Sequence, residues 1–337
     1  MTDFSAPLLA WHERHGRHDL PWQVCDPYLR WLAEIMLQQT TVATVVPYFE
    51  RFRARFPSVA ALAEAPLDDV LALWAGLGYY ARARNLHASA RLVMARHGGV
   101  FPRTLAAWTA LPGVGPSTAG AILAFAFGIS APILDANARR VLGRFHGLRG
   151  RDATTTRQLW DYAQAHTPLK GAGVYTQAIM DLGALVCRRT PDCGACPVAR
   201  SCAYDGSEPP PLKRVRPERT VVMAIVHDRA QKVLLVRRPP HGIWGGLWSL
   251  PECPTLAELP QRLASLGIGG HPAAPCPPRR HVFTHFALSI VPVPVALGSV
   301  TCRVSENSDM MWYKRHGARP GMPAPIWRLL NHFMEII

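Results

Sequence analysis

Apolar residues recur at helical spacing through the first half of the chain, from residue 29 to residue 180. Breaks such as Phe56-Pro57 divide this stretch, because proline and glycine disfavour a continuous helix. A spacing of three or four residues places the apolar side chains of each segment on one face, which can then be buried. The pattern predicts an all-α domain made of many short helices.

The composition and hydrophobic pattern of the sequence change after Cys202. The stretch DGSEPPPLKRVRPER is rich in proline and charge and has no hydrophobic periodicity, which is typical of a linker. Beyond it, segments such as TVVMAIVH and KVLLVRR have the length and the β-branched composition of strands. We therefore expect a multidomain protein, with a helical domain over residues 1–206, a linker over residues 207–219 and an α+β domain over residues 220–337.

Length and charge narrow the class of protein. The chain has 337 residues, enough for two domains with full cores. Lysine and arginine number 37 against 23 aspartates and glutamates, and a net charge of +14 favours a polyanion such as nucleic acid. A generally basic proteome would produce the same charge, so composition alone leaves both explanations open.

The sequence does not predict a membrane protein. Its N-terminus lacks the basic start and apolar core of a signal peptide. The longest apolar run, residues 119–134, contains glycine, serine and proline and is too short to span a bilayer. We expect a soluble, cytoplasmic protein that does not bind membranes.

Four closely spaced cysteines follow the predicted helical region. They lie in CRRTPDCGACPVARSC, with five, two and five residues between neighbours: Cys187, Cys193, Cys196 and Cys202. Four thiolates suit tetrahedral zinc as well as an iron–sulfur cluster. Disulfides are disfavoured, because nothing else in the chain indicates an oxidising compartment. The cysteines alone leave zinc and iron–sulfur open.

A glycine-rich turn precedes the cysteines. In LPGVGPSTAG, Gly113 and Gly115 permit tight backbone geometry, and Ser117 with Thr118 can cap the helix that follows. Amides exposed at such a helix start bind anions, although a purely structural turn can carry the same glycines. Asp135 favours a functional interpretation. It follows the second helix, and it would lie beside a nucleotide of a DNA strand whose backbone is bound at the turn.

Glu34 is a second candidate acid. It interrupts the apolar face of the helix predicted for WLAEIMLQQTTVATV. Burial in such a setting raises the pKa of a carboxyl group, which could then donate a proton. If Glu34 stood alone, a solvated helix glutamate would be the simpler interpretation.

Together these segments resemble MutY-type adenine DNA glycosylases. The matching stretches run in the family's order from about Leu8 to the C-terminus: LPWQ, AEIMLQQTTVATVVPYFERF, LWAGLGYYARARNLH, LPGVGPSTAGAIL, ILDANARRVLGR, the cysteine segment and RRPPHGIWGGLWSLPE. The resemblance implies a helix-hairpin-helix glycosylase fold with an iron–sulfur loop over residues 187–202, followed by a Nudix-like domain. It also implies a 4Fe-4S cluster on the four cysteines, and a monomer that removes adenine mispaired with 8-oxoguanine or guanine in double-stranded DNA.

The resemblance implies roles for individual residues. Glu34 matches the acid that protonates adenine at N7, Asp135 the aspartate that stabilises the sugar cation or traps it covalently, and Asn137 the polar residue beside that aspartate. The remaining matches imply DNA contacts: Trp22, Gln23 and Gln177 in the adenine pocket, Gln39 and Tyr79 as wedges in the base stack, Gly113, Gly115 and Ser117 in the hairpin, Arg188 and Arg189 at phosphates, and His281, Phe283, Thr284 and His285 at 8-oxoguanine.

Three positions depart from the family's pattern. Cys187 and Cys193 enclose five residues where the family usually has six. Ala136 lies where the family usually has glycine, so a positive φ at that position is either not needed or met with strain. Ser117 lies where many members carry tyrosine. These departures concern the path of the cysteine loop and the contacts around Asp135.

Other functions fit the chain less well. Endonuclease III-type glycosylase/lyases share the hairpin and the cluster but carry a lysine at the position of Ser117, and serine cannot form a Schiff base. A non-catalytic damage-binding module would need neither acid. Nudix hydrolases bind their metal through clustered carboxylates; Gly246 and Glu252 fit that motif, but Pro260-Gln261 and Ala264-Ser265 replace the other ligands. We expect a monofunctional glycosylase whose second domain binds without hydrolysing.

Overall fold

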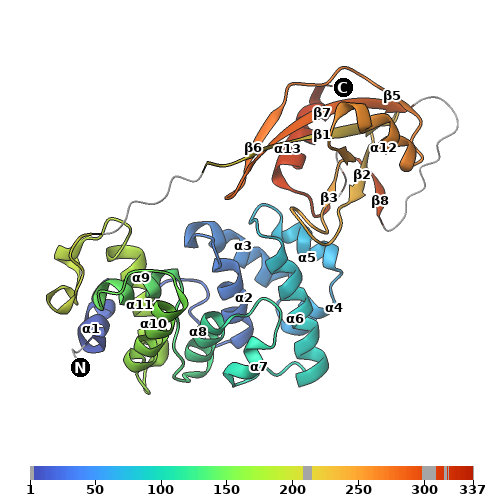
Figure 1. The fold of residues 1–337 in the computed structure, drawn as a ribbon. Coiled ribbons are helices and arrows are strands. Elements are labelled where there is room, and N and C mark those ends of the chain that lie inside the picture. Colours follow the sequence, from blue (N-terminus) through green and yellow to red (C-terminus); the bar gives the residue numbers. More distant parts are fainter. Residues whose placement is uncertain (1–3, 208–214, 298–308, 315–316, 318, 337) are drawn as a thin grey trace. The chain divides into compact units, whose positions relative to one another are not determined.

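The computed structural model describes residues 4–207, 215–297, 309–314, 317 and 319–336 (Figure 1). Most of the predicted linker, residues 208–214, lies outside the described residues. The chain divides into two compact units. The first unit comprises residues 1–65 and 84–209, and the second comprises residues 66–83 and 210–337.

The first unit is helical, as the sequence pattern predicted. Its helices are α1 (Ser5–His15), α2 (Pro27–Leu37), α3 (Val42–Arg55), α4 (Val59–Glu64), most of α6 (Ala81–His97), α7 (Leu105–Thr109), α8 (Pro116–Phe127), α9 (Ala136–Phe145), α10 (Ala153–His166) and α11 (Ala172–Asp181). A π-helical turn η1 (Leu182–Val186) and two short 3-10 turns, η2 (Cys193–Ala195) and η3 (Ala199–Ser201), follow α11.

Local signals explain where these helices begin. The Asp26 side chain accepts hydrogen bonds from the amides of Tyr28 and Leu29, and Pro27 occupies the first position of α2. Thr41 caps α3 and Asp152 caps α10 in the same way. Each cap satisfies amides that have no partner within their own helix.

One buried core joins the C-terminal helices of the first unit. It includes Leu142 and Phe145 of α9, Tyr175 and Ile179 of α11, and Leu8 of α1. Three of the four cysteines pack against the same core: Cys187, Cys196 and Cys202. The cysteine segment is therefore anchored on a core that includes α9, the helix that begins at Asp135.

The second unit is a mixed sheet with helices. Its elements are α5 (Leu67–Trp74), β1 (Glu218–His227), β2 (Val233–Arg237), β3 (Trp248–Ser249), β4 (Glu252–Cys253), η4 (Leu256–Glu258), α12 (Leu259–Ser265), β5 (Gly270–Pro272), β6 (Arg279–Val282), β7 (Ala287–Leu297), β8 (Met310–Tyr313) and α13 (Ala324–Ile336). The main strand order is β3-β2-β1-β7-β5, with β4 paired to β1, β6 to β7 and β8 to β2. The α+β prediction is confirmed.

Strands β1 and β7 form the centre of this sheet (Figure 1). They run parallel, with Glu218 opposite Ala287 and His227 opposite Ala296, whereas the other strand pairs are antiparallel. Their buried residues pack with Leu259 and Leu263 of α12. Strand β6 pairs with the first residues of β7, so residues 283–286 form a tight connection at that end of the sheet. No helix in the described part of the chain is long and apolar enough to cross a membrane.

Candidate active site

Glu34 lies on α2 in a partly buried position. Burial and then the charge of Asp135 raise the pKa of Glu34 to about 7, and Arg30 opposes this shift. A carboxyl group with such a pKa is available in its protonated form near neutral pH and can act as an acid. Because the charge of Asp135 acts on Glu34, the two carboxyl groups lie within electrostatic range of each other.

Asp135 occupies the N-cap position of α9. One carboxylate oxygen, Oδ1, accepts a hydrogen bond from the amide of Ala138 at 2.7 Å. Burial raises the pKa of Asp135, while this bond, the amide of Asn137 and the charge of Arg140 act in the opposite direction. The helix start thus fixes the carboxylate and supplies positive partial charge beside it.

Asn137 connects Asp135 to the cysteine segment. Its side-chain nitrogen Nδ2 lies 3.4 Å from Asp135 Oδ2, and its oxygen accepts a 2.8 Å bond from the Arg140 guanidinium. Arg140 also donates to the carbonyl oxygens of Gly183 and Cys187, at 2.7 and 2.6 Å. A Cβ atom at Gly183 would lie 2.6 Å from the Cβ of Asn137, so only glycine permits this approach.

The alanine at position 136 creates no backbone strain. Ala136 is the first residue of α9, and it is not among the non-glycine residues with positive φ. The glycine found at this position in the family is therefore not needed here for conformational freedom. A positive φ at position 136 is therefore not needed in this chain, and no strain is stored there.

The predicted hairpin turn lies between α7 and α8. Gly113 has φ +77°, a conformation that favours glycine, and a Cβ there would lie 2.9 Å from Asn85. Gly115 is the N-cap of α8, and no side chain caps this helix. Pro116 occupies the first helical position. The start of α8 therefore presents backbone amides with no side-chain cap, which is the arrangement that binds an anion.

Ser117 does not cap α8, contrary to the prediction. Its hydroxyl group instead accepts a 3.0 Å hydrogen bond from the amide of Leu134. This bond ties the helix after the hairpin to the residue immediately before Asp135. A backbone amide 17 residues away takes the oxygen that a local cap would use.

Gln39 and Tyr79 share an uncommon backbone conformation. Their φ angles are +58° and +50°, and both side chains are exposed. Non-glycine residues rarely adopt positive φ, and such strain gathers at functional sites. The neighbouring Gln38 donates to the carbonyl oxygen of Gly113 and to Thr118, which anchors the turn that carries Gln39. The ring of Tyr79 lies 5.5 Å from the guanidinium of Arg82.

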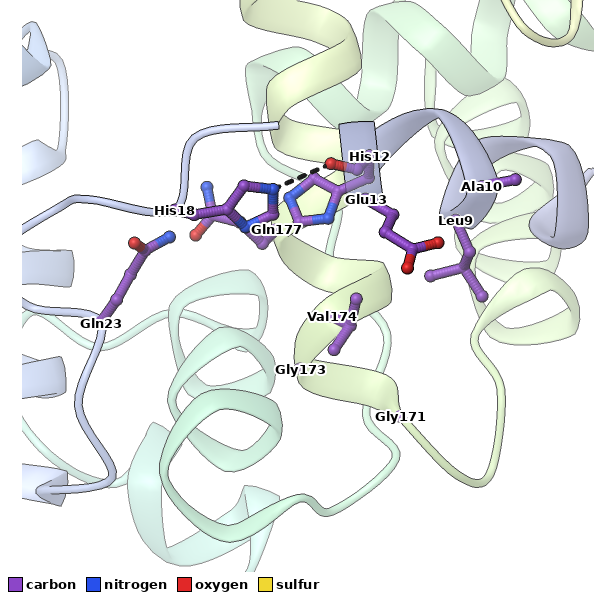
Figure 2. A pocket seen from close by; sticks show the side chains of 10 residues that line it. All are labelled: Leu9, Ala10, His12, Glu13, His18, Gln23, Gly171, Gly173, Val174 and Gln177. Carbon is purple, nitrogen blue, oxygen red and sulfur yellow. Dashed lines mark hydrogen bonds between the residues drawn. The ribbon is translucent and has the colours of Figure 1, made fainter. Parts of the chain in front are cut away.

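Gln23 and Gln177 line one open pocket of about 890 Å³ (Figure 2). Trp22 is 3% exposed and packs edge-on against Phe49, so its ring is part of the core. Gln23 donates to the carbonyl of Arg17 and accepts from the amide of Leu20, which holds the loop between α1 and α2. The lining of this pocket does not include Glu34 or Asp135. The candidate residues thus fall into two pairs: Gln23 and Gln177 line one pocket, and Glu34 lies within electrostatic range of Asp135.

Asp181 organises the polar side of this pocket, and the sequence analysis missed it. It is fully buried and accepts bonds from Gln177 at 2.9 Å and from the Arg17 guanidinium at 2.6 Å. Because a carboxylate only accepts, Gln177 must present its NH₂ group to Asp181, which leaves its carbonyl oxygen for a ligand. His12 Nε2 lies 3.3 Å from Asp181, and burial lowers the pKa of His12. A lone carboxylate within the apolar run AIMDLGALV was the available signal.

The four predicted cysteine ligands line a single cavity of about 120 Å³. All are free thiols, and burial raises the pKa of Cys196 and of Cys202, with the neighbouring cysteines adding to the shift. Within the described residues, no three His, Cys, Asp or Glu side chains form a group that could hold a metal ion. Thiolates are the ligands of zinc and of iron–sulfur clusters alike, so the residue types present suit either group.

Arg144 braces the cysteine segment from α9. It donates to the carbonyl oxygens of Arg188 and Arg189, at 2.6 and 3.1 Å, and approaches Cys187 Sγ at 3.4 Å. The main chain is held by these bonds, while the side chains of Arg188 and Arg189 are exposed. Arg140 and Arg144 were both missed in the sequence, because an arginine on a helix gives no signal of a partner more than 40 residues away.

In the second unit, an aromatic cluster holds the connection between β6 and β7. The Phe283 ring stacks on Phe286 and packs edge-on against His281, each at a 4.6 Å centroid distance. Trp244, another residue that the sequence analysis missed, lies 5.4 Å from Phe283 and has φ +56°. Thr284 is exposed at the tip of the connection, and its hydroxyl lies 3.5 Å from His285 Nδ1.

Glu252, which fits the Nudix motif, is engaged by an arginine. It forms an ion pair with Arg238, which also donates to the carbonyl of Ile243 at 3.0 Å. The positions that would supply further metal ligands lie on α12, a short helix whose residues 259–265 read LPQRLAS. One carboxylate already paired with arginine is a weak site for a magnesium ion.

Family models match both parts of the chain. Residues 32–164 match the HhH-GPD superfamily base excision DNA repair protein, and residues 221–332 match the NUDIX domain. An adenine DNA glycosylase of Buchnera aphidicola subsp. Acyrthosiphon pisum is 34% identical over 345 residues, covering 99% of this chain and 98% of that protein. The human adenine DNA glycosylase is 42% identical over 216 residues, which span 60% of this chain and 39% of the human protein.

Solved structures resemble the helical part of the chain. A thermostable thymine-DNA glycosylase superposes with a TM-score of 0.55 at 29% identity, covering 60% of this chain and 94% of that one. Endonuclease III in a non-covalent DNA complex gives a TM-score of 0.51 at 22% identity, covering 58% of this chain, a likeness of fold alone. The predicted helix-hairpin-helix fold with a Nudix-like second domain is confirmed.

Proposed function

Because the chain belongs to the adenine DNA glycosylase family, we propose that it excises adenine mispaired with 8-oxoguanine or guanine in double-stranded DNA, as a monofunctional enzyme. The observation that carries the proposal is the pair of partly buried carboxyl groups, Glu34 and Asp135, of which Glu34 has a pKa raised to about 7. One group is suited to give a proton and the other to remain charged. The enzyme acts on the N-glycosyl bond.

In the proposed reaction, Glu34 donates its proton to N7 of the extruded adenine. The bond between N9 of adenine and C1′ of the sugar then breaks, and its electron pair leaves with the base. Without protonation the leaving group would be an adenine anion, which is a poor leaving group. General acid catalysis of this kind contributes about 10²- to 10⁴-fold to the rate.

Asp135 is the proposed partner of the positive sugar. Its carboxylate is fixed by the Ala138 amide and by Asn137, so it needs no rearrangement when charge develops at C1′. It either stabilises the cation or forms a transient covalent bond with it. Water then attacks C1′, and its proton passes to a carboxylate of the pair, which leaves an abasic site.

Recognition of the DNA is proposed to use three features of the helical half of the chain. The uncapped amides at the start of α8, after Gly113 and Gly115, bind a backbone phosphate. Gln39 and Tyr79, which adopt positive φ, wedge into the base stack during extrusion. The Gln177 carbonyl accepts a hydrogen bond from the exocyclic amine of adenine, while Trp22 and Gln23 shape the loop beside it.

The cysteine cavity is proposed to hold a 4Fe-4S cluster on Cys187, Cys193, Cys196 and Cys202. The proposal is supported by the resemblance of the four-cysteine segment to that of the family and by the cavity that all four thiols line. When bound, such a cluster would cross-link the loop through its four cysteines. The residues of the loop itself, Arg188 and Arg189, then contact DNA phosphates.

The second unit is proposed to read the base opposite adenine. The exposed Thr284 can hydrogen-bond the lesion or its backbone, and Phe283 can wedge beside it, with His281 and His285 completing the contact. Hydrolysis of nucleotides is not part of the proposal, since Glu252 is paired with Arg238. The protein would work as a monomer on nucleoid DNA in the cytoplasm.

Adenine release tests the proposed function. Single-turnover rates are measured on a duplex with one adenine opposite 8-oxoguanine, and compared with adenine opposite guanine and opposite thymine. The first two substrates should be processed, and the third should not. Borohydride should trap little covalent adduct, because Ser117 cannot form an imine. Equal rates on all three duplexes, or efficient trapping with strand cleavage, would contradict the proposal.

A further inference from the structure

A basic pocket lies in the second unit, lined by residues of β6, β7 and α13. It has a volume of about 560 Å³. Its lining combines three arginines, two histidines and an apolar floor: Arg279, Arg280, Arg328, His281, His332, Pro278, Ile290, Pro325 and Leu329. No carboxylate is among these described lining residues, so the positive charge has no counterion within the pocket.

The backbone explains why these side chains converge. Arg279 and His281 are two apart on β6, and alternate residues of a strand point to the same face. Arg328 and His332 are four apart on α13, so they share one face of that helix. Two polar groups from the strand therefore meet two from the helix in one pocket.

The groups in the pocket differ in charge. Arg280 has a partner at 3.4 Å in Glu218, and both are exposed, so this arginine is partly compensated. Burial and the charge of Arg328 lower the pKa of His281, which keeps its ring neutral at pH 7. Arg279 and Arg328 are left as the principal cations, and both are exposed at the mouth of the pocket.

The lining chemistry separates two kinds of phosphate ligand. A free nucleotide is usually held by an aromatic face for its base and by carboxylates for its magnesium ion. No Phe, Tyr, Trp, Asp or Glu lines this pocket, a statement that rests on residues the structure describes. Exposed arginines suit a long polyanion that passes over the surface, because their planar groups bind phosphate oxygens through paired hydrogen bonds.

We infer that this pocket binds a backbone phosphate of DNA, on the strand that carries the base opposite adenine. The inference rests on the proposed function, because His281 both lines the pocket and packs against Phe283 in the connection assigned to that base. A phosphate held by Arg279 and Arg328 fixes the register of the strand on this connection. Phosphate contacts position a duplex and base contacts select the sequence, so the pocket adds affinity and placement.

The test uses the full chain with glutamine in place of each principal cation, as Arg279→Gln, Arg328→Gln and the double variant. Glutamine keeps a polar side chain and removes the charge. Arg229→Gln is the matched control, since Arg229 is exposed and follows the far end of β1. Arg229 lies two residues beyond the end of β1 and is not among the residues that line the pocket.

Equilibrium binding to an undamaged duplex is measured by fluorescence anisotropy as salt increases from about 50 to 200 mM. Removing one interaction with a phosphate should reduce the steepness of log K against log salt by about 0.9. In the double variant the slope should fall by about 1.8 if the arginines hold separate phosphates, and by about 0.9 if they share one. Arg229→Gln should retain the wild-type slope. A wild-type slope in the double variant overturns the inference.

Two further measurements separate the possible failures. Titration with GDP tests the free-nucleotide alternative: binding of GDP that is abolished in the variants, with an unchanged DNA slope, would reassign the pocket. Adenine release at saturating enzyme should be unaltered in the variants. If release is normal and the slope does not change, this inference fails alone. If the slope changes but wild type releases no adenine, the proposed function fails and the pocket keeps a DNA phosphate without an assigned strand. Should Arg328→Gln lower the melting temperature, Arg279→Gln on the exposed strand decides.

Discussion

The two units place their candidate functional groups in opposite environments. In the first, Glu34 and Asp135 are partly buried, and burial is the main cause of the raised pKa of each. In the second, Thr284 and the arginines of the basic pocket are exposed. Chemistry at a base needs a carboxyl group whose proton affinity is tuned by exclusion of water, whereas recognition of a strand needs groups that reach it. Substitutions in the first unit should therefore lower the rate of adenine release, and substitutions in the second should lower DNA binding or base preference.

The largest effect is expected from the buried pair. Glu34→Gln keeps the size of the side chain but cannot donate the proton, and Asp135→Asn removes the counter-charge of the sugar cation. Each should reduce the single-turnover rate of adenine release by about a thousandfold or more, with mispair binding nearly intact. The measurement pairs rapid-quench kinetics with anisotropy on the same duplex. Near-normal rates in either variant would remove that residue from the proposed mechanism.

The next largest effect concerns pH: the rate of adenine release should depend on it, and DNA binding by the second unit should not. The pKa of Glu34 is raised to about 7, and the acid is active only while protonated. The single-turnover rate should therefore be highest below pH 7 and fall by about tenfold for each pH unit well above it. Binding by the second unit's arginines should stay level over the same range, since arginine remains charged. A rate that rises through pH 7 would show that Glu34 works as a base.

A smaller and more selective effect is expected at the exposed connection. Thr284→Ala removes one hydrogen bond to the opposite base or its backbone, at a cost of about 1 to 3 kcal/mol. The preference for 8-oxoguanine over guanine should fall on the order of tenfold, without a change in the rate of the guanine mispair. Thr284→Ser, which keeps the hydroxyl, is the matched control and should retain most of the preference. Equal losses with both substitutions would indicate a packing role.

The smallest effect concerns the geometry that supports Asp135. Ser117→Ala removes the hydroxyl that accepts the Leu134 amide, a bond of about 1 kcal/mol. Adenine release should slow by about fivefold, while Ser117→Thr should be closer to wild type because it can still accept the bond. DNA affinity serves as the check. If affinity falls and the rate does not, Ser117 contacts DNA directly instead of positioning the aspartate.

The sequence predicted the features that depend on local pattern. The helical first domain, the strands of the second and the tight turn at Gly113 follow from spacing, β-branching and glycine. Glu34 was predicted because it interrupts the apolar face of a helix, and Asp135 because it follows the helix after the glycine-rich turn. In the structure the charge of Asp135 acts on Glu34. Their catalytic roles, like those of the other proposed site residues, stay predictions.

Contacts between distant positions were beyond the sequence. Asp181 is bound by Arg17, 164 residues away, and nothing in the pattern near either residue indicates the pair. Ser117 was predicted as a cap because capping is a local rule, and a distant amide overrides it. The positive φ of Gln39 belongs to the same class, since the turn is held by Gln38 on the hairpin.

The two arginines of α9 have a consequence for which parts of the chain can change in length. Arg140 and Arg144 hold the carbonyl oxygens of residues 187–189, at the start of the segment from Cys187 to Cys193. Residues 190–192, the remainder of that segment, take no part in these three contacts, so a change in length there would leave the contacts in place. The segment is one residue shorter here than is usual in the family. An insertion or deletion within α9 would rotate Asp135 and the arginines out of register by about 100° per residue. We therefore expect α9 to tolerate less change in length than residues 190–192.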